Sequence, residues 1–371
     1  MKKILIGYLI DGKTSGIDRY VLNLCHALQK KKVSIDVLTY NATEELYQLA
    51  EQEQFGLVEV ASLKHPLRQY RDMLSLFRDR TYDVAYFNIS EAFNSIGVLA
   101  AYRLGVPRIA VHSHNSGSGS SKKIVRIFRE KLNHWAKGAM IGERATDYLA
   151  CSEKAGQWLF TERAIKSNPV QIIYNTVDEE RYTFSRESRE KKRTELGLED
   201  HLVVGHIGNF IYQKNHSFLI DIMNELHRIR PDAVLLLIGD GPDVGKIKER
   251  ILDEGLQDCV KYLGIRKDVP ELMQAMDAFV LPSHFEGLPF AAIEAQMAGL
   301  YTLLSDNISR ETRISSRCDF LSLGESPKVW AEKLVEAEGI QREKKDFSEN
   351  YRLFGRTGQM EELLGRLQLI D

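Results

Sequence analysis

The segment Glu286-Gly-Leu-Pro-Phe-Ala-Ala-Ile-Glu294 decides the fold of this chain, because it joins a strand pattern to a helix pattern. Residues 277–282, just upstream, contain a short apolar run that is typical of a buried parallel strand. Residues 289–298 have helical composition, begin with proline and end before glycine, which are the residues preferred at a helix start and just past its end. The sequence therefore predicts a strand, a glycine turn that holds Glu286 and a helix that contains Glu294.

This turn suits a ligand that carries both negative charge and hydroxyl groups. Backbone amides at a helix N-terminus bind anions. Glu294 lies among alanine, isoleucine and methionine residues, where an unpaired charge would be costly. The two carboxylates suit hydroxyl-rich parts of the same ligand, and an anion with hydroxyls on both sides describes a sugar nucleotide. The alternative is a solvated turn carboxylate followed by an exposed helix glutamate.

Strand-like apolar runs alternate with helix-period segments through two successive halves of the chain. This alternation predicts an α/β protein with parallel sheets that are covered by helices on both faces. We expect two Rossmann-like domains, residues 1–177 and 178–350, that face a cleft and are joined by a charged linker at residues 178–192. A helical pattern follows at residues 351–369. The predicted strands are residues 3–10, 34–40, 82–88, 108–112, 147–151 and 170–174, then 202–208, 233–239, 260–263, 278–281 and 301–305, and two of the predicted helices are residues 17–30 and 91–104.

Composition and charge argue against several other classes of protein. A formal charge of −2 over 371 residues argues against a dedicated nucleic-acid binder, which is normally strongly basic. No apolar stretch approaches the length of about 18 residues that spans a membrane. The apolar run near the N-terminus is broken by Asp11, so we expect a core strand there and no signal peptide. The cysteines form no C-x-x-C pair and are expected to be free thiols in a reducing cytosol: Cys25, Cys151, Cys259 and Cys318.

Further motifs follow in order along the chain: Gly16-Ile-Asp-Arg19, Val111-His-Ser-His-Asn115, Asn175-Thr-Val-Asp178, Gly208-Asn-Phe-Ile-Tyr-Gln-Lys214 and Gly239-Asp-Gly-Pro242. Together with the glutamate segment they resemble retaining glycosyltransferase family four, and the likeness spans almost the whole chain. The resemblance implies the GT-B architecture, in which the first domain binds the acceptor and the second binds the nucleotide sugar. It also implies that a C-terminal helix, within residues 351–371, crosses back to the first domain.

The resemblance implies a role for each candidate site residue. Glu294 would bind the ribose hydroxyls, and Glu286 would lie by the ring hydroxyls of the sugar near the reacting carbon. His114 would contact the donor sugar or the leaving phosphate, and His112 is the less favoured partner. A histidine after a strand is otherwise often just a polar loop residue. The other donor-binding residues would hold the sugar and the phosphates: Gly16, Arg19, Asn209, Arg266, Gly287, Leu288, Pro289 and Phe290.

Lys214 follows a predicted strand and precedes a predicted helix, where a lysine can stabilise the charge that develops on a leaving diphosphate. The alternative is a solvated loop lysine. The chain departs from the family at Asn209, where many members have arginine, so Arg266 could supply that charge instead. Losing a charge-assisted contact typically costs about 1.5–3 kcal/mol. Ser15 also departs, because the family commonly has a glycine there, while Gly16 keeps the close-approach role.

Residues 121–137 hold six basic side chains against one acid, Glu130, with apolar residues at helical spacing. One interpretation is a helix whose apolar stripe faces the core and whose basic face is solvated. The other is a helix that lies on an anionic membrane surface or steers a lipid diphosphate acceptor toward the site.

The sequence predicts no metal site and no cofactor. It lacks the D-x-D motif of other glycosyltransferases and any His or Cys cluster with zinc spacing. A competing phosphate-binding motif, which would use Lys13 and Thr14, matches the Walker A pattern. It is disfavoured because Tyr8, Leu9 and Ile10 continue the strand where a compact loop is needed.

We therefore expect a metal-independent, retaining glycosyltransferase that moves a hexose or N-acetylhexosamine from a nucleoside diphosphate, in particular UDP, to a lipid-linked saccharide in surface polysaccharide biosynthesis. It would work in the cytoplasm, peripherally at the inner face of the plasma membrane, without nucleic-acid partners. Two alternatives stay open: a non-catalytic partner subunit that binds a sugar nucleotide, and a nucleotide-sugar epimerase of the same fold.

Overall fold

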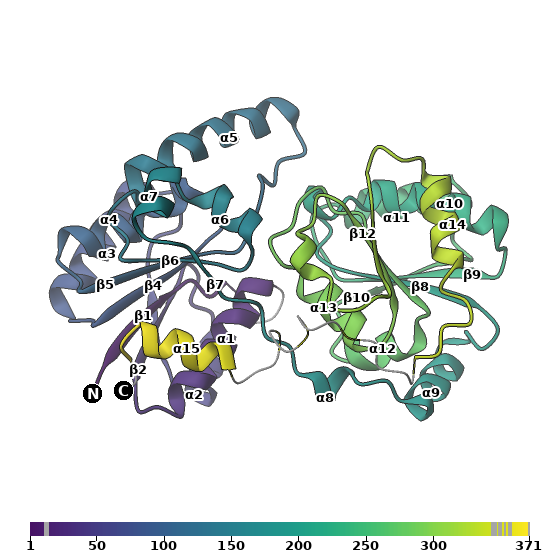
Figure 1. Cartoon of the computed structure of the whole chain (residues 1–371), viewed down its shortest axis with the longest axis horizontal. Coiled ribbons are helices and arrows are strands. Elements are labelled where there is room, and N and C mark those ends of the chain that lie inside the picture. The colour runs from purple at the N-terminus through teal and green to yellow at the C-terminus, as the bar shows by residue number, and fades with distance from the viewer. Residues whose placement is uncertain (11–14, 343–346, 348–350, 352–353, 355–357, 370–371) are drawn as a thin grey trace. The chain divides into compact units, whose positions relative to one another are not determined.

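The computed structural model describes residues 1–10, 15–342, 347, 351, 354 and 358–369. The chain splits into two compact units (Figure 1). Unit 1 comprises Met1–Ser118, Lys122–Thr176 and Arg356–Asp371, and unit 2 comprises Gly119–Ser121 and Val177–Gly355. Each unit is built on one parallel sheet with helices packed against it. The predicted α/β fold with two Rossmann-like domains is therefore confirmed.

The sheet of unit 1 has seven parallel strands in the order β3-β2-β1-β4-β5-β6-β7. The order reverses between β1 and β4, and ligands of such sheets bind outside the carboxyl ends of the strands at this switch point. The central strands are buried, which explains their continuous apolar runs. The strands are β1 (Lys3–Gly7), β2 (Ser34–Thr39), β3 (Gly56–Glu59), β4 (Val84–Ile89), β5 (Arg108–Ser113), β6 (Asp147–Ala150) and β7 (Gln171–Ile172).

Several helices of unit 1 begin after a serine or threonine whose side chain caps the helix. Ser15 is the N-cap of the first helix, and its Oγ accepts a hydrogen bond of 2.9 Å from the Asp18 backbone N–H. This cap gives Ser15 a structural reason for replacing a glycine. The helices are α1 (Gly16–Gln29), α2 (Glu44–Gln52), α3 (Pro66–Asp79), η1 (Ala92–Asn94), α4 (Ile96–Arg103), α5 (Lys123–Ala136), η2 (Lys137–Ile141), α6 (Glu153–Leu159), α7 (Glu162–Ser167) and α15 (Gly358–Arg366).

The last of these helices, α15, packs on α1, the first helix of the same unit (Figure 1). The Arg366 Nε donates to Asp147 at 3.3 Å, and the Gln359 side chain accepts a hydrogen bond of 2.8 Å from the Tyr174 backbone N–H. Unit 1 is thus completed by a segment that follows unit 2 in the sequence.

The sheet of unit 2 repeats the strand order of unit 1 without its last strand: β10-β9-β8-β11-β12-β13. Its switch point lies between β8 and β11, which are paired in parallel through Ala278 and Phe279. The strands are β8 (Leu202–Ile207), β9 (Ala233–Ile238), β10 (Val260–Gly264), β11 (Ala278–Leu281), β12 (Tyr301–Ser305) and β13 (Cys318–Leu321). The helices are α8 (Glu179–Tyr182), α9 (Arg186–Leu196), η3 (Tyr212–Lys214), α10 (His216–Ile229), α11 (Val244–Asp253), α12 (Val269–Ala275), α13 (Phe290–Met297), η4 (Arg310–Thr312) and α14 (Pro327–Val335).

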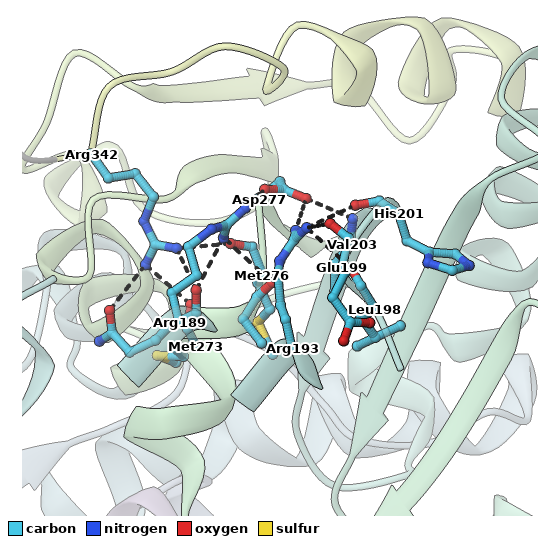
Figure 2. Close-up of polar contacts among 12 residues, drawn as sticks. Arg189, Arg193, Leu198, Glu199, His201, Val203, Met273, Met276, Asp277 and Arg342 are labelled. Carbon is cyan, nitrogen blue, oxygen red and sulfur yellow. Dashed lines mark hydrogen bonds and ion pairs between the residues drawn. The ribbon is translucent and has the colours of Figure 1, made fainter. Parts of the chain in front are cut away.

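A cluster of three arginines closes the amino end of β11 (Figure 2). Arg189 and Arg193, both on α9, form ion pairs with Asp277, the residue before the strand. Arg342 donates to the carbonyls of Met276, at 2.8 Å, and Ala298, which follow α12 and α13. Burial, aided by the nearby Arg189, lowers the pKa of Arg342 to about 9, so the guanidinium stays charged at neutral pH. These contacts satisfy helix-end carbonyls that would otherwise be buried without partners.

Several sequence predictions need correction. Residues 178–192 are not a plain linker, because they fold largely into α8 and α9, and Arg189 of α9 bonds to the Met276 carbonyl of unit 2. The helix predicted at residues 91–104 is split into η1 and α4 at Ser95. The strand predicted at residues 3–10 ends at Gly7, and β3 and β13 were not predicted. All four cysteines are buried and free, as predicted.

Candidate active site

The site in unit 2 is centred on an ion pair between Lys214 and Glu286. Lys214 follows β8 and Glu286 follows β11, so both come from the switch point of the sheet. The Lys214 Nζ lies 2.6 Å from the Glu286 Oε1. Ser283 donates to the same oxygen at 3.0 Å, and the Gln213 Nε2 donates to Oε2 at 2.9 Å. The carboxylate is only 6% exposed, so these three donors stabilise its charge.

Two glycines let the loop after β8 reach this position. A Cβ at Gly208 would lie 3.0 Å from the Cε of Lys214, whose stem passes over the glycine. Gly239 has φ +134°, and a Cβ there would lie 2.1 Å from the Gly208 carbonyl oxygen. The motif at Gly239 therefore serves close packing of two strand-end loops, as expected of a strand-to-helix turn.

The glutamate segment forms the predicted strand, turn and helix. Gly287, Leu288 and Pro289 lead into α13, which begins at Phe290 with Pro289 as its N-cap. The positive end of the helix dipole thus lies beside the Lys214–Glu286 pair. Glu294 lies inside α13 and is 3% exposed, so it is not the solvated helix residue of the alternative interpretation.

The two other cationic or polar candidates of unit 2 differ in their surroundings. Asn209 is half-buried in the loop after β8, next to Gly208. Arg266 forms a forked ion pair with Asp268, at 2.7 Å for each of two hydrogen bonds, and Lys192 contacts the same carboxylate at 3.0 Å. The pair with Arg266 and then Lys192 holds the pKa of Asp268 far below its usual range, so the carboxylate stays charged. The pair with Asp268 uses the Nε and Nη2 of Arg266.

Two buried histidines lie beneath the Lys214 loop. The His206 Nδ1 donates to the Val280 carbonyl at 2.9 Å, and the His206 and His216 rings are 4.6 Å apart. Phe210 stacks on His216 at 3.9 Å. Burial lowers the pKa of His206 to about 4 and that of His216 to about 2, so both rings are neutral under the site.

The site in unit 1 lies at the carboxyl ends of β4 and β5. The rings of His112, on β5, and of His114, directly after it, have centroids 4.0 Å apart. His112 is fully buried, and its Nδ1 hydrogen-bonds the Tyr86 hydroxyl at 2.7 Å, which in turn bonds the Tyr20 hydroxyl at 2.8 Å. His114 keeps partial exposure, so it is the better placed of the two histidines to contact a ligand.

The glycine-rich motif of unit 1 is described only in part. Gly16 is the first residue of α1 and is exposed, and Arg19 follows one turn later on the same helix. Lys13 and Thr14, on which the Walker interpretation depends, lie outside the described residues. The strand β1 ends at Gly7.

The basic segment forms α5, and its apolar stripe is exposed. Ile124, Phe128 and Trp135 share one face of the helix and are 84%, 66% and 64% exposed. The interpretation that this stripe faces the core is therefore wrong. Arg129 turns to an ion pair with Glu91.

The described residues offer neither a metal-binding cluster nor a membrane-spanning helix. No group of three or more His, Cys, Asp or Glu side chains in this part of the chain is arranged to hold a metal ion. Likewise, none of the described helices has the length and apolar character needed to cross a membrane.

The comparisons with known proteins agree with the fold. The family described as Glycosyl transferases group 1 matches residues 188–354, and Glycosyltransferase Family 4 matches residues 14–181. The chain is 31% identical over 353 residues to the putative glycosyltransferase EpsF of Bacillus subtilis (strain 168). The aligned residues cover 93% of this chain and 90% of that protein. The chain belongs to glycosyltransferase family four.

Three further matches have a lower sequence identity than EpsF. This family four enzyme is 27% identical over 251 residues to a UDP-Gal:alpha-D-GlcNAc-diphosphoundecaprenol alpha-1,3-galactosyltransferase of Escherichia coli, over 66% of this chain and 63% of that one. The crystal structure of Anabaena Alr3699/HepE in complex with UDP and glucose matches with a TM-score of 0.79 and 19% identity over 99% of each chain. WaaG, a glycosyltransferase involved in lipopolysaccharide biosynthesis, matches with a TM-score of 0.69 and 16% identity over 99% of each chain. These similarities show the GT-B fold.

Proposed function

We propose that this glycosyltransferase moves a hexose or N-acetylhexosamine from a UDP-sugar to a hydroxyl of a lipid-diphosphate-linked saccharide, with retention of configuration and without a metal. The observation that carries the proposal is the buried Lys214–Glu286 pair at the switch point of unit 2. It offers a cation for a diphosphate and a carboxylate for hydroxyls within one site.

The pair suggests how donor binding and chemistry are linked. The Lys214 ammonium is neutralised by Glu286, which lies 2.6 Å away. A diphosphate would compete for the ammonium, and the extra charge that develops as the bond to the sugar breaks would hold it more strongly. Gln213 and Ser283 would keep the Glu286 carboxylate in place for the sugar hydroxyls. Glu294 would bind the ribose hydroxyls, and the start of α13 would support the phosphates.

Relatives support the choice of donor and acceptor. The Escherichia coli relative is named for a UDP-Gal donor and a diphosphoundecaprenol-linked acceptor, and HepE was crystallised with UDP-glucose. Transfer without a metal rests on Lys214 as the cation at the diphosphate and on the lack of a D-x-D motif in the sequence. Unit 1 would bind the acceptor and unit 2 the donor, as in the family that the chain resembles.

The exposed face of α5 supports the proposal that the enzyme binds to a membrane surface. Its large apolar side chains and its basic residues fit an amphipathic helix that lies in the interface of an anionic bilayer. We propose that α5 holds the enzyme at the inner face of the plasma membrane, where a lipid-linked acceptor in surface polysaccharide assembly would be found.

The donor is tested by titrating a set of sugar nucleotides into the protein by calorimetry and by assaying transfer to a lipid-diphosphate saccharide. We expect one UDP-sugar to bind and to be consumed only with acceptor, with turnover unchanged by excess chelator. Lys214→Ala should abolish most turnover, and Glu294→Ala should weaken UDP binding. Conversion of the donor without acceptor would favour an epimerase, and loss of turnover in chelator with rescue by Mn²⁺ would refute the metal-independent mechanism.

Membrane binding is tested by cosedimentation with phosphatidylglycerol vesicles. Phe128→Ser should weaken binding by about tenfold to a hundredfold, because burying such a side chain is worth about 1.5–3 kcal/mol. Leu252→Ser is the matched control, since Leu252 is 65% exposed and lies on α11 of unit 2. Equal effects of the two changes would remove α5 from the interface.

A further inference from the structure

Asn88 occupies the switch point of the unit 1 sheet and its side chain has a fixed orientation. It lies on β4, and its Nδ2 donates to the carbonyl of Gly7, the last residue of β1, at 2.8 Å. A backbone carbonyl can only accept a hydrogen bond. The carboxamide nitrogen is therefore the atom that faces Gly7, and the oxygen faces the other way.

This orientation fixes the proton of a neighbouring histidine. The Asn88 Oδ1 lies 2.7 Å from the His114 Nε2. Because the amide oxygen can only accept, Nε2 must donate and must carry the proton. Burial lowers the pKa of His114 to about 3, so the ring is neutral at physiological pH and its Nδ1 holds a lone pair without a proton.

The groups packed around His114 do not oppose this state. Tyr20 from α1 lies 4.8 Å from it and His112 from β5 lies 4.0 Å from it, measured between ring centroids. Burial raises the pKa of the Tyr20 hydroxyl and lowers that of His112, so both are neutral. Asn88 is neutral as well. No charge from these three side chains favours an imidazolium at His114.

We propose that Asn88 is a positioning residue that holds His114 as its Nε2–H tautomer, so that Nδ1 accepts a hydrogen bond from a ligand hydroxyl and is unsuited to a phosphate oxygen. A lone pair attracts a hydroxyl hydrogen and repels an anionic oxygen, which has no proton to donate. The part that concerns a sugar hydroxyl rests on the proposed function. The tautomer itself does not. With a lone pair at Nδ1, the partner of His114 is the donor sugar and not the leaving phosphate.

The first test is nitrogen NMR of the full-length protein with labelled histidines, with the His114 signals assigned through His114→Gln. We expect a protonated Nε2 and a bare Nδ1 throughout pH 6–8. A protonated Nδ1, or a ring that titrates near its ordinary pKa, would overturn the proposal. This measurement needs no substrate and no Asn88 variant, so it stands whether or not the proposed function holds.

The second test compares UDP with the UDP-sugar that binds, in Asn88→Asp and in Asn41→Asp. A carboxylate at position 88 raises the pKa of His114, because it favours the imidazolium. A charged ring no longer accepts through Nδ1 and instead attracts phosphate. We expect the preference for the UDP-sugar over UDP to fall by about fivefold to tenfold, which is the net worth of one hydrogen bond, about 1 kcal/mol or slightly more.

Asn41 is the control, because it is an exposed asparagine of the same unit and receives the same change of charge. Asn41→Asp should leave the preference unchanged. If Asn88→Asp leaves the preference for the UDP-sugar over UDP unchanged, or alters it no more than Asn41→Asp does, His114 does not accept a hydrogen bond from a sugar hydroxyl. If no nucleotide sugar binds to the wild type, the proposed function fails, while NMR still decides the tautomer.

Discussion

The Lys214–Glu286 pair makes a quantitative prediction about the stability of unit 2. Lys214→Met removes the ammonium but keeps the stem that passes over Gly208. Breaking one side of a buried ion pair typically costs about 3–5 kcal/mol, because a buried charge is left unpaired. Ser283 and Gln213 still donate to the two carboxylate oxygens of Glu286, so we expect the lower end, about 3 kcal/mol.

The companion change is Glu286→Gln, which removes the charge and keeps the shape. In Lys214→Met this second change should restore part of the lost stability, since no charge remains buried. Pairs in contact usually show interaction energies of about 0.5–3 kcal/mol, and a separation of 2.6 Å at a buried site places this pair in the upper half of that range.

The assay is urea unfolding followed by the fluorescence of Trp330. This tryptophan is fully buried in unit 2, while the other two, Trp135 and Trp158, lie in unit 1 and can be replaced by phenylalanine. The signal then reports unit 2 alone. Additive effects of the two single changes, within about 0.5 kcal/mol, would mean that the pair does not form in solution. The proposed link between donor binding and release of Lys214 would then fail as well.

Three further predictions concern the same unit. Gly239→Ala should destabilise unit 2 far more than Gly208→Ala, since the first Cβ meets a backbone oxygen and the second meets a flexible lysine stem; equal unfolding midpoints would contradict this. Because the pKa of His206 is lowered to about 4 by burial, the unfolded state binds its proton first, so stability is full above pH 6.5 and falls as the pH drops toward 4. His206→Leu should reduce the loss of stability between pH 6.5 and pH 4, and an unchanged pH profile of stability would refute this role of His206. Asn209→Arg should raise turnover at saturating donor by about tenfold through a charged, forked donor, and slower turnover would show that Asn209 has a role of its own.

Burial on both faces explains which parts of the fold could be predicted. β8, β9 and β11 are buried through almost their whole length, so their sequences are continuous apolar runs between turns. β3 and β13 lie at sheet edges and are partly exposed, and Asp319 interrupts the second. Such strands form because a neighbouring strand offers backbone hydrogen bonds. The local sequence does not indicate which strand that neighbour is.

The helix α9 shows how long-range ion pairs override composition. Its sequence is highly charged, which suggested a linker, yet Arg193 is buried and bonds Asp277 more than eighty residues later. The contacts in Figure 2 that involve Asp277 join residues far apart in the chain, so the local sequence does not indicate them. Arg266 is different, because its partner Asp268 stands two residues away, and that spacing was available in the sequence.

The candidate site was predictable in its charged members and not in the residues that orient them. Glu286 and Lys214 could be found from the strand, turn and helix patterns that contain them. Gln213 precedes Lys214 and Ser283 lies three residues before Glu286, but both are uncharged, so no sequence pattern indicated their role. Asn88 was missed because its role depends on contacts with β1 and with His114, which follows β5.

The position of α15 has a consequence for synthesis of the protein. On the ribosome, β1 to β7 emerge early, but the helix that packs on α1 emerges only after residues 177–355 have been made. At about 5–20 residues per second this takes roughly ten to thirty-five seconds. During that time the surface of α1 that α15 will cover is exposed on a nascent chain, and it offers a site where chaperones can bind. A chain that stalls within unit 2 would therefore leave its first-made domain unfinished, even though every strand of that domain has been translated.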